Sequence, residues 1–209
     1  MSSANQPEPV LRAYGGEAGD ARVARRRAAL IEAALDMLAQ DDDGTVTVRG
    51  VCARAELTPR YFYESFPGID DLVAAAYDGV IARITEQALG AFAAGDDSKD
   101  KVRGAVDAVV GVIESDRRVG RLLFADTVRS PVVSRKRAES TRLFVALTGD
   151  SAVEAVGVAP GPVTTAAAYF QVGGLGRLLA AWTEGEVQVD RTQLVDVCVH
   201  LLLGLGSLP

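Results

Sequence analysis

The dipeptide Thr58-Pro59 constrains this chain more than any other feature, because it is the clearest helix start in the sequence. A threonine can accept a hydrogen bond from an unpaired N–H group of a first helical turn. A proline in the first helical position has a preset φ and no N–H group to leave unpaired. The helix that follows is predicted to end at about Ser65, where Phe66-Pro67-Gly68 stops it.

A second short helix is predicted just before this one. Thr47 can cap it, and its apolar positions, among them Val51 and Ala55, last for only about two turns. The two short helices, at residues 47–55 and 58–65, are then separated by a tight turn. This is the form of a helix-turn-helix, in which the second helix enters the major groove of DNA.

The rest of the chain repeats apolar residues at the spacing of amphipathic helices. Neither a convincing strand pair nor an internal repeat is found, so the prediction is an all-α fold of about nine helices. It consists of an N-terminal three-helix bundle with the helix-turn-helix and a larger C-terminal helical domain. The other helices are expected at residues 21–40, 69–94, 99–114, 118–128, 132–156, 162–184 and 191–205. Residues 1–20 hold too few apolar side chains to offset the entropy of ordering, so a disordered tail is expected there.

The helix predicted at residues 58–65 has two different faces. At 100° per residue, Phe62 and Phe66 lie on one side, where they can be buried, and Arg60 and Glu64 lie opposite, flanked by tyrosines. An arginine can read guanine O6 and N7, and a tyrosine can contact phosphate or a thymine methyl group. Glu64 is either an acceptor for cytosine N4–H or a partner that orients Arg60. The alternative is that the tyrosines are packing residues of an ordinary helical corner.

Charge excludes one class of DNA-binding protein. The chain has 209 residues with 22 Lys+Arg and 28 Asp+Glu, a formal net charge of −6, so it is not a basic coat for nucleic acid. A local cluster is present instead, because four arginines between positions 22 and 27 stand at the start of the first helix. Such a cluster can grip phosphates or enter a minor groove, or it is only a solvated helix end.

The cellular setting is predicted from cysteines and apolar stretches. Cys52 and Cys198 are far apart, which argues against a disulfide framework and fits a reducing compartment. The N-terminus lacks the features of a secretory signal, and the apolar stretches fall short of the ~20 residues that a membrane span needs. We therefore expect a cytoplasmic protein without a membrane partner.

The stretch 45–68 resembles the TetR (tetracycline-repressor) family of transcriptional regulators, and the resemblance covers about residues 21–80. It implies a homodimer with an N-terminal DNA-binding domain, here residues 21–68. It also implies a C-terminal domain, here residues 69–209, that dimerises and binds a small-molecule inducer. Tyr63 takes the place of the family's phosphate-contacting tyrosine, and Phe62 and Phe66 take its core positions. A repressor released from a palindromic operator by an unidentified hydrophobic or amphipathic effector is therefore expected.

Three positions depart from the family pattern. Glu56 stands where the family has a turn glycine, which costs roughly 1 kcal/mol if its φ is positive. Ser65 replaces an aromatic residue and is a smaller phosphate donor, and Ile69 replaces a lysine that anchors phosphate. The residues expected to contact double-stranded DNA are Arg22, Arg25, Arg26, Thr47, Arg49, Thr58, Pro59, Arg60, Tyr61, Tyr63, Glu64 and Ser65.

The last two helices are the candidates for the dimer interface. They are richer in apolar residues than burial on one side requires, and their glycines let helices approach closely. The alternative is that they are the innermost helices of a monomer. The expected interface residues are Ala166, Phe170, Gly173, Gly174, Arg177, Leu194, Val197, His200 and Leu201.

An inducer pocket is expected between the helix at 69–94 and the helices from 99 to 184, because a ligand there can tilt the former and change the spacing of the DNA-reading helices. Core packing is the alternative for each of its residues. The candidate ligand-binding residues are Tyr77, Phe92, Phe124, Asp126, Thr127, Phe144, Tyr169 and Gln171.

An enzyme and an adaptor protein are the rival interpretations. The single histidine, His200, lies near the C-terminus, and no Ser/His/Asp or Cys/His catalytic arrangement is found that could use it. The metal-binding spacings HExxH and CxxC do not occur. Residues 173–176 resemble a dinucleotide-binding fingerprint only superficially, because no strand precedes them. We therefore expect no catalytic residue, no metal and no cofactor. Loss of specific DNA binding on replacement of Arg60 would separate a regulator from an adaptor.

Overall fold

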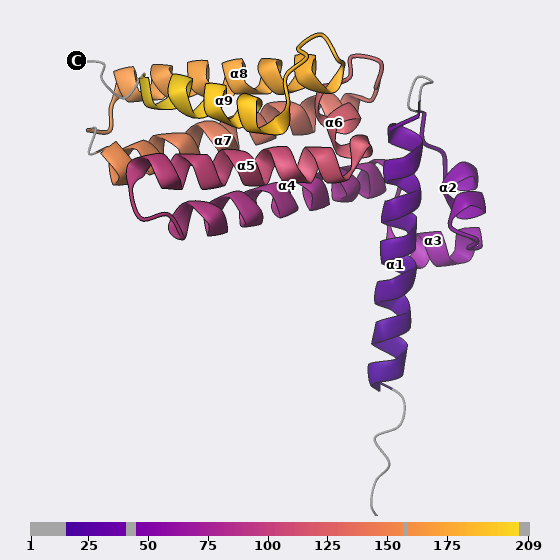
Figure 1. Ribbon diagram of the computed structural model, residues 1–209. Coiled ribbons are helices and arrows are strands. Elements are labelled where there is room, and N and C mark those ends of the chain that lie inside the picture. Colours follow the sequence, from indigo (N-terminus) through magenta and orange to yellow (C-terminus); the bar gives the residue numbers. More distant parts are fainter. Residues whose placement is uncertain (1–15, 41–44, 157–158, 205–209) are drawn as a thin grey trace, which may run out of the picture.

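A computed structural model describes residues 16–40, 45–156 and 159–204 of the chain. Every regular element in these residues is an α-helix, which confirms the all-α prediction (Figure 1). Figure 1 shows α1, α2 and α3 standing to one side of the other helices. We call α1–α3 the head and α4–α9 the body. The helices are α1 (Gly16–Leu38), α2 (Val48–Arg54), α3 (Pro59–Ser65), α4 (Ile69–Ala93), α5 (Ser98–Ser115), α6 (Arg117–Phe124), α7 (Pro131–Val156), α8 (Pro162–Thr183) and α9 (Arg191–Gly204).

The two short helices begin as their first residues predict. The hydroxyl oxygen of Thr47 accepts a hydrogen bond from the Gly50 N–H group at 3.1 Å, and α2 starts at the next residue. Pro59 occupies the first turn of α3. The prediction that the Thr58 hydroxyl caps α3 is wrong, because the Thr58 side chain makes no capping hydrogen bond. Its backbone carbonyl accepts from the Tyr61 and Phe62 N–H groups instead.

The turn between α2 and α3 has the geometry expected of a glycine. Glu56 has a φ of 54°, in the left-handed region that side chains disfavour. The turn then closes with a 2.9 Å hydrogen bond from the Leu57 N–H group to the Cys52 carbonyl. The chain therefore forms the tight turn of a helix-turn-helix with a residue that strains it.

The head has its own hydrophobic core, and α4 completes it. Phe62 of α3 and Phe66, the residue that follows this helix, are almost fully buried in one cluster with Leu30 of α1. Leu72 and Ala76, from the first two turns of α4, belong to the same cluster. The start of α4, a helix of the body, thus also forms part of the core of the head.

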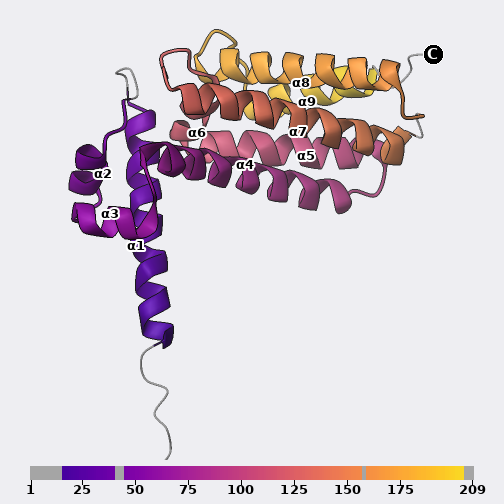
Figure 2. The same ribbon diagram turned by 180° about the vertical axis from the view of Figure 1, so that it is seen from behind.

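The body is a layered bundle. Figures 1 and 2 both show α8 and α9 on one side of it, α4 on the opposite side, and α5 and α7 between them. Its core includes Val110 and Leu122, which are fully buried, and Tyr77, whose side chain is 1% exposed. α4 and α5 approach closely at Gly104, where a Cβ atom would lie 2.9 Å from the carbonyl oxygen of Ala91.

Several predicted boundaries are corrected. α1 begins at Gly16, so residues 16–20 are helical and not part of a tail, while residues 1–15 lie outside the described residues. The argument from low apolar content missed this turn, because helix propensity does not require apolar side chains. α6 ends at Phe124 and not at 128, because Ala125 has an extended ψ of 125°. None of the described helices is long and apolar enough to cross a membrane.

Charged side chains join the head to the body. Arg118, at the start of α6, donates from Nη1 to Asp36 of α1 at 2.6 Å and to Glu32 of α1 at 3.0 Å. Its Nη2 donates to Asp116 at 2.8 Å. Asp36 also accepts from Nη1 of Arg54 of α2 at 3.4 Å. One carboxylate of α1 therefore bonds to both the second helix of the head and the body.

Candidate DNA-reading surface and ligand cavity

The outer face of α3 is exposed, and the buried face fixes its orientation. The side chain of Arg60 is 84% exposed, Tyr63 is 63% exposed and Tyr61 is 37% exposed. On the other side, the Phe62 and Phe66 rings lie in the core with their centroids 6.2 Å apart. The helix is thus anchored by two aromatic residues and presents three large polar side chains to a partner.

Glu64 pairs with two arginines. Its carboxylate accepts from Nε of Arg60 at 2.9 Å and from Nη1 of Arg26 at 3.2 Å. Because Nε of Arg60 is engaged, the guanidinium is oriented while its two terminal nitrogens stay available for a base edge. Of the two roles considered for Glu64, the structure has the geometry of the partner that orients Arg60.

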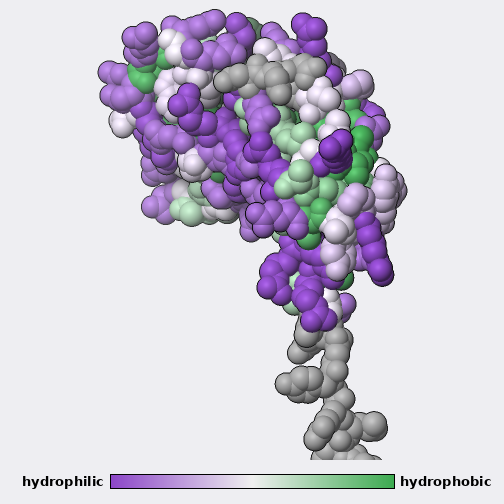
Figure 3. Space-filling view, turned by 90° about the vertical axis from the view of Figure 1, so that its right-hand side faces the viewer, coloured by the Kyte–Doolittle hydropathy of each residue, from purple (hydrophilic) through white to green (hydrophobic). Residues whose placement is uncertain are grey.

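Arginines of α1 border the same surface. The guanidinium of Arg26 lies 4.2 Å from the centroid of the Tyr61 ring, a cation–π contact that ties α1 to α3. Arg25, the residue before Arg26, and Arg22, one turn nearer the N-terminus, are both exposed. Figure 3 faces this side of the molecule and shows hydrophilic side chains gathered at the lower end of the head. These cations extend the exposed face of α3 along α1.

The smaller polar candidates divide into free and engaged groups. Arg49 is exposed on α2, and Thr47 is exposed although its oxygen caps that helix. The hydroxyl of Thr58 serves no cap and is exposed beside Pro59. The Ser65 hydroxyl donates to the Tyr61 carbonyl at 2.9 Å, which corrects the expectation of a phosphate donor in this conformation.

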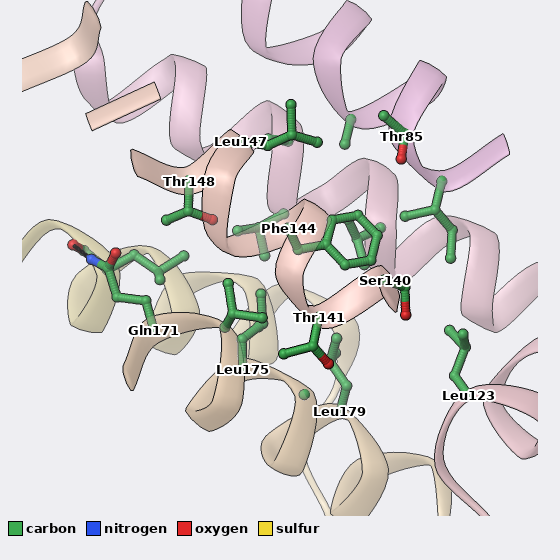
Figure 4. Close-up of a pocket in the computed structure, with 18 of the residues that line it drawn as sticks. Thr85, Leu123, Ser140, Thr141, Phe144, Leu147, Thr148, Gln171, Leu175 and Leu179 are labelled. Carbon is green, nitrogen blue, oxygen red and sulfur yellow. Dashed lines mark hydrogen bonds between the residues drawn. The ribbon is translucent and has the colours of Figure 1, made fainter. Parts of the chain in front are cut away.

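The body contains a partly open cavity of about 460 Å³, in the range of sites for drug-sized ligands. Side chains from all six helices α4–α9 line it, so it lies in the region where an inducer pocket was expected. Figure 4 shows Phe144 of α7 between α4 and α8, with Leu175 and Leu179 of α8 nearby. The predicted residues that line it are Tyr77, Phe92, Phe124, Phe144 and Gln171.

Three predicted cavity residues lie elsewhere. Asp126 and Thr127 were placed on a helix by the expected range 118–128, but α6 ends before them and both are exposed in the turn to α7. Tyr169 is 51% exposed and lies at a second hollow between α7 and α8, apart from the main cavity. The periodicity of α8 did not show which of its faces turns inward.

The cavity wall contains polar groups that sequence reasoning missed. Arg137, Ser140 and Thr141 line it from one turn of α7, and Thr85 lines it from α4 (Figure 4 labels all but Arg137). The Tyr77 hydroxyl and the Ser140 hydroxyl are 2.9 Å apart. Burial raises the pKa of Tyr77, so its hydroxyl keeps its proton at neutral pH. The sequence offered one weak indication of these residues, namely that they are polar residues within otherwise apolar stripes of predicted helices.

The outer faces of α8 and α9 expose large apolar side chains. Phe170 is 69% exposed, Leu201 57% and Val197 47%, and Ala166 and His200 are exposed with them. Leu194 is a correction, since it is 1% exposed and belongs to the body core. Three other predicted residues also lie on or beside this outer surface: Gly173, Gly174 and Arg177 are exposed, and the first and last of these line the cavity as well.

Comparison with solved structures finds the same fold in transcriptional regulators. The fatty acid degradation regulator FadR from Bacillus halodurans has a TM-score of 0.72 at 17% identity, over 86% of this chain and 95% of that one. The transcriptional regulator FadR from Bacillus subtilis, in complex with stearoyl-CoA, has a TM-score of 0.68 at 14% identity, over 84% and 96%. A TetR-family transcriptional regulator from Streptomyces coelicolor has a TM-score of 0.66 at 20% identity, over 88% and 95%.

Comparisons with family models and with curated proteins find no match to this sequence. The structural likeness therefore establishes the fold: a helix-turn-helix head on a helical body, as in the TetR-type regulators.

Proposed function

We propose that this chain is a homodimeric, sequence-specific DNA-binding regulator of the TetR family, a repressor that a small amphipathic effector releases from a palindromic operator. The observation that carries this proposal is the exposed face of α3, where Arg60, Tyr61 and Tyr63 project from a helix anchored by two buried phenylalanines. Residues 21–68 would bind DNA, and residues 69–209 would bind the effector and dimerise.

The electrostatics of the head support binding through a local patch. Glu64 forms ion pairs with Arg26 and Arg60. These two cations offset the charge of the carboxylate, which would otherwise repel the phosphates of DNA. The exposed cations of Arg22, Arg25 and Arg49 lie on the neighbouring helices α1 and α2. In this proposal Arg60 reads a base edge, and the tyrosines and the other arginines position the head on phosphates.

The exposed apolar face of α8 and α9 supports a dimer. Phe170, Val197 and Leu201 expose apolar surface that a monomer would leave in water. A Cβ atom added at Gly173 or Gly174 would meet nothing within 4 Å in this chain, so a partner helix has room to approach there. A two-fold protein matches a palindromic operator, whose half-sites lie roughly 34–36 Å apart.

The position of α6 supports release by an effector. Its first residues bond to α1 through Arg118, and its last residues, Leu123 and Phe124, line the cavity. A ligand that displaces α6 changes the contact between body and head, and thus the placement of the two α3 helices in the dimer. The Bacillus subtilis FadR complex with stearoyl-CoA is an example of a ligand complex in this fold.

We propose no catalytic function for the cavity. His200 is on the outer face of α9, exposed and apart from the cavity lining. Among the described residues, no group of three His, Cys, Asp or Glu side chains is placed to hold a metal ion. Cys52 and Cys198 are free and buried, and neither lines the cavity.

The test is selection of a binding site from random duplex DNA, followed by gel-shift titration. The Arg60→Ala variant should lose the preference for the selected site while keeping the oligomeric state of the wild type, because its side chain is at the surface. One bidentate base contact is worth about 1–3 kcal/mol per half-site, so the affinity should fall at least about tenfold. Arg129→Ala is the matched control, since it removes an equal charge from an exposed position on the body. Unchanged selectivity of Arg60→Ala would refute the assignment.

A further inference from the structure

The cavity contains a positive charge that no carboxylate of its wall balances. Among the described residues, its lining includes two arginines, Arg137 and Arg177, and no Asp, Glu or Lys. Arg137 is half-buried, and among the described residues it forms no ion pair within 4 Å. Burial lowers the pKa of Arg137, the sign of a cation held away from water. An arginine remains charged even so, because its guanidinium is not deprotonated in proteins.

The protein bonds to only part of this guanidinium. Nε and Nη2 of Arg137 donate to the Leu122 carbonyl at 3.1 and 2.8 Å, and Nη2 donates to the Ala125 carbonyl at 2.9 Å. These bonds satisfy the end of α6 and fix the plane of the guanidinium. Within the described chain, Nη1 is left without a hydrogen-bond acceptor. Carbonyl dipoles bind the group but carry no net charge. The carboxylate of Asp126, which lies outside the cavity lining, acts on Arg137 from a distance and forms no ion pair with it.

The neighbouring hydroxyl protons are already used. Ser140 and Thr141 both donate to the Arg137 carbonyl, at 3.0 and 2.9 Å. The Ser140 oxygen therefore accepts from the Tyr77 hydroxyl, which uses the Tyr77 proton as well. The available donor at this end of the cavity is thus Nη1 of Arg137. A ligand group placed there must accept a hydrogen bond.

A second polar atom lies farther along the cavity. The Thr85 hydroxyl is buried and has no hydrogen-bond partner in the described part of the chain. It is two helical turns beyond Tyr77 on α4, about 12 Å at 1.5 Å per residue. Between and around these two points the wall is apolar, with Ile84, Leu123 and Phe144.

We propose that the cavity selects an amphipathic carboxylate, whose anionic head group binds Nη1 of Arg137 at the end next to α6 and whose apolar body extends past Phe144 toward Thr85. This inference deepens the proposed function, because it names the chemical class of the effector. It also places the effector's charge on the residue that bonds to the end of α6. Charge pairing in a site of low polarity is stronger than in water, so the head group would dominate selectivity.

Arg177 is the internal control for this assignment. It also lines the cavity, but its side chain is 70% exposed and lies 3.9 Å from Glu186, which already balances its charge. A cation whose charge a neighbouring carboxylate already balances contributes little to selectivity. Removal of Arg177 should therefore leave the preference for anions intact.

The experiment measures binding of decanoate, decan-1-ol and decylamine to the full-length protein, by displacement of the neutral dye Nile red below the micellar range. The three probes share a ten-carbon chain and differ in charge. Wild-type protein should bind decanoate at least about tenfold more tightly than decan-1-ol, and decylamine most weakly, since one charge-assisted bond is worth roughly that factor. Arg137→Gln should bind decanoate and decan-1-ol equally. Arg177→Gln should retain the wild-type preference.

Arg137→Lys is a second variant at this position, needed because Arg137→Gln also removes hydrogen bonds to the end of α6 and could perturb the fold. It keeps the positive charge, so a preference for decanoate should persist even if affinity falls. Equal binding of decanoate and decan-1-ol by the wild type would overturn the proposal of an anionic effector. It would not affect the proposed function of a DNA-binding regulator, whose effector would then be neutral. A preference that disappears with Arg177 and not with Arg137 would also overturn it. Absence of binding by all three probes would overturn it too, and gel-shift titration would test DNA binding separately.

Discussion

Replacement of Glu56 by glycine should stabilise the protein. Glu56 has a φ of 54°, and an L-residue in the left-handed region costs roughly 1–2 kcal/mol relative to its preferred conformations. Glycine adopts this φ freely but loses more backbone entropy on folding, about 0.5–1 kcal/mol. The net expected gain in the free energy of unfolding is therefore between about 0 and 1.5 kcal/mol, with a central value near 0.75 kcal/mol. The Glu56 side chain is exposed, so its removal takes little packing away.

Ala53→Gly is the matched control, three residues earlier in the same motif. Ala53 is exposed and helical, so a glycine there should lower the free energy of unfolding by about 1 kcal/mol. Replacement by glycine should thus raise the free energy of unfolding at position 56 and lower it at position 53. Urea unfolding followed by circular dichroism measures both values, and thermal unfolding should show shifts of ~2–4 °C per kcal/mol. If Glu56→Gly destabilises the protein as Ala53→Gly does, the turn is not strained in solution and the reasoning fails.

Three other predictions concern the contacts of the proposed regulator. Arg118→Gln should weaken the effect of an effector on DNA affinity by about 1 kcal/mol, measured as the ratio of operator Kd values with and without decanoate, because it removes the bonds to α1. Phe170→Glu should shift the protein to monomer in analytical ultracentrifugation, since it places a charge on the exposed face of α8. The double variant Arg22→Ala, Arg25→Ala should reduce the slope of log Kd against log salt by up to about 3.6, because a dimer would lose four phosphate contacts.

Each of these has a control and an outcome that contradicts it. Arg103→Gln breaks an ion pair to Asp196 within the body and should leave the effector response unchanged, so an equal loss would argue against a special role for Arg118. Leu143→Glu changes a 41% exposed leucine on α7 and should not dissociate the dimer. An unchanged salt slope in the double variant would show that the N-terminal arginines are only a solvated helix end.

The head was predicted well because its structure depends on local chemistry. Thr47 and Pro59 set helix starts through groups within one turn, and Phe62 and Phe66 follow from a single helical period. The strain at Glu56 was also visible, because a family pattern with a glycine at that position implies a positive φ. Such features need no knowledge of distant residues.

The cavity was predicted less well because its wall is tertiary. Arg137 was not a candidate, since its role depends on carbonyls 12 and 15 residues earlier in the chain. Asp126 and Thr127 were wrong candidates, because α6 ends before them, and the contact that binds its last carbonyls comes from α7. α8 and α9 are apolar all round, so periodicity did not separate the buried Leu194 from the exposed Leu201.

The shared core of the head limits how this protein can be cut and recombined. A fragment that ends at residue 68 would lose Leu72 and Ala76 from the cluster that buries Phe62, and Asp36 would lose its bond to Arg118. Residue 68 divides two tasks but does not divide two independently stable units. A chimera that gives this head a new regulatory body must therefore carry over the first two turns of α4 and supply a cation opposite Asp36.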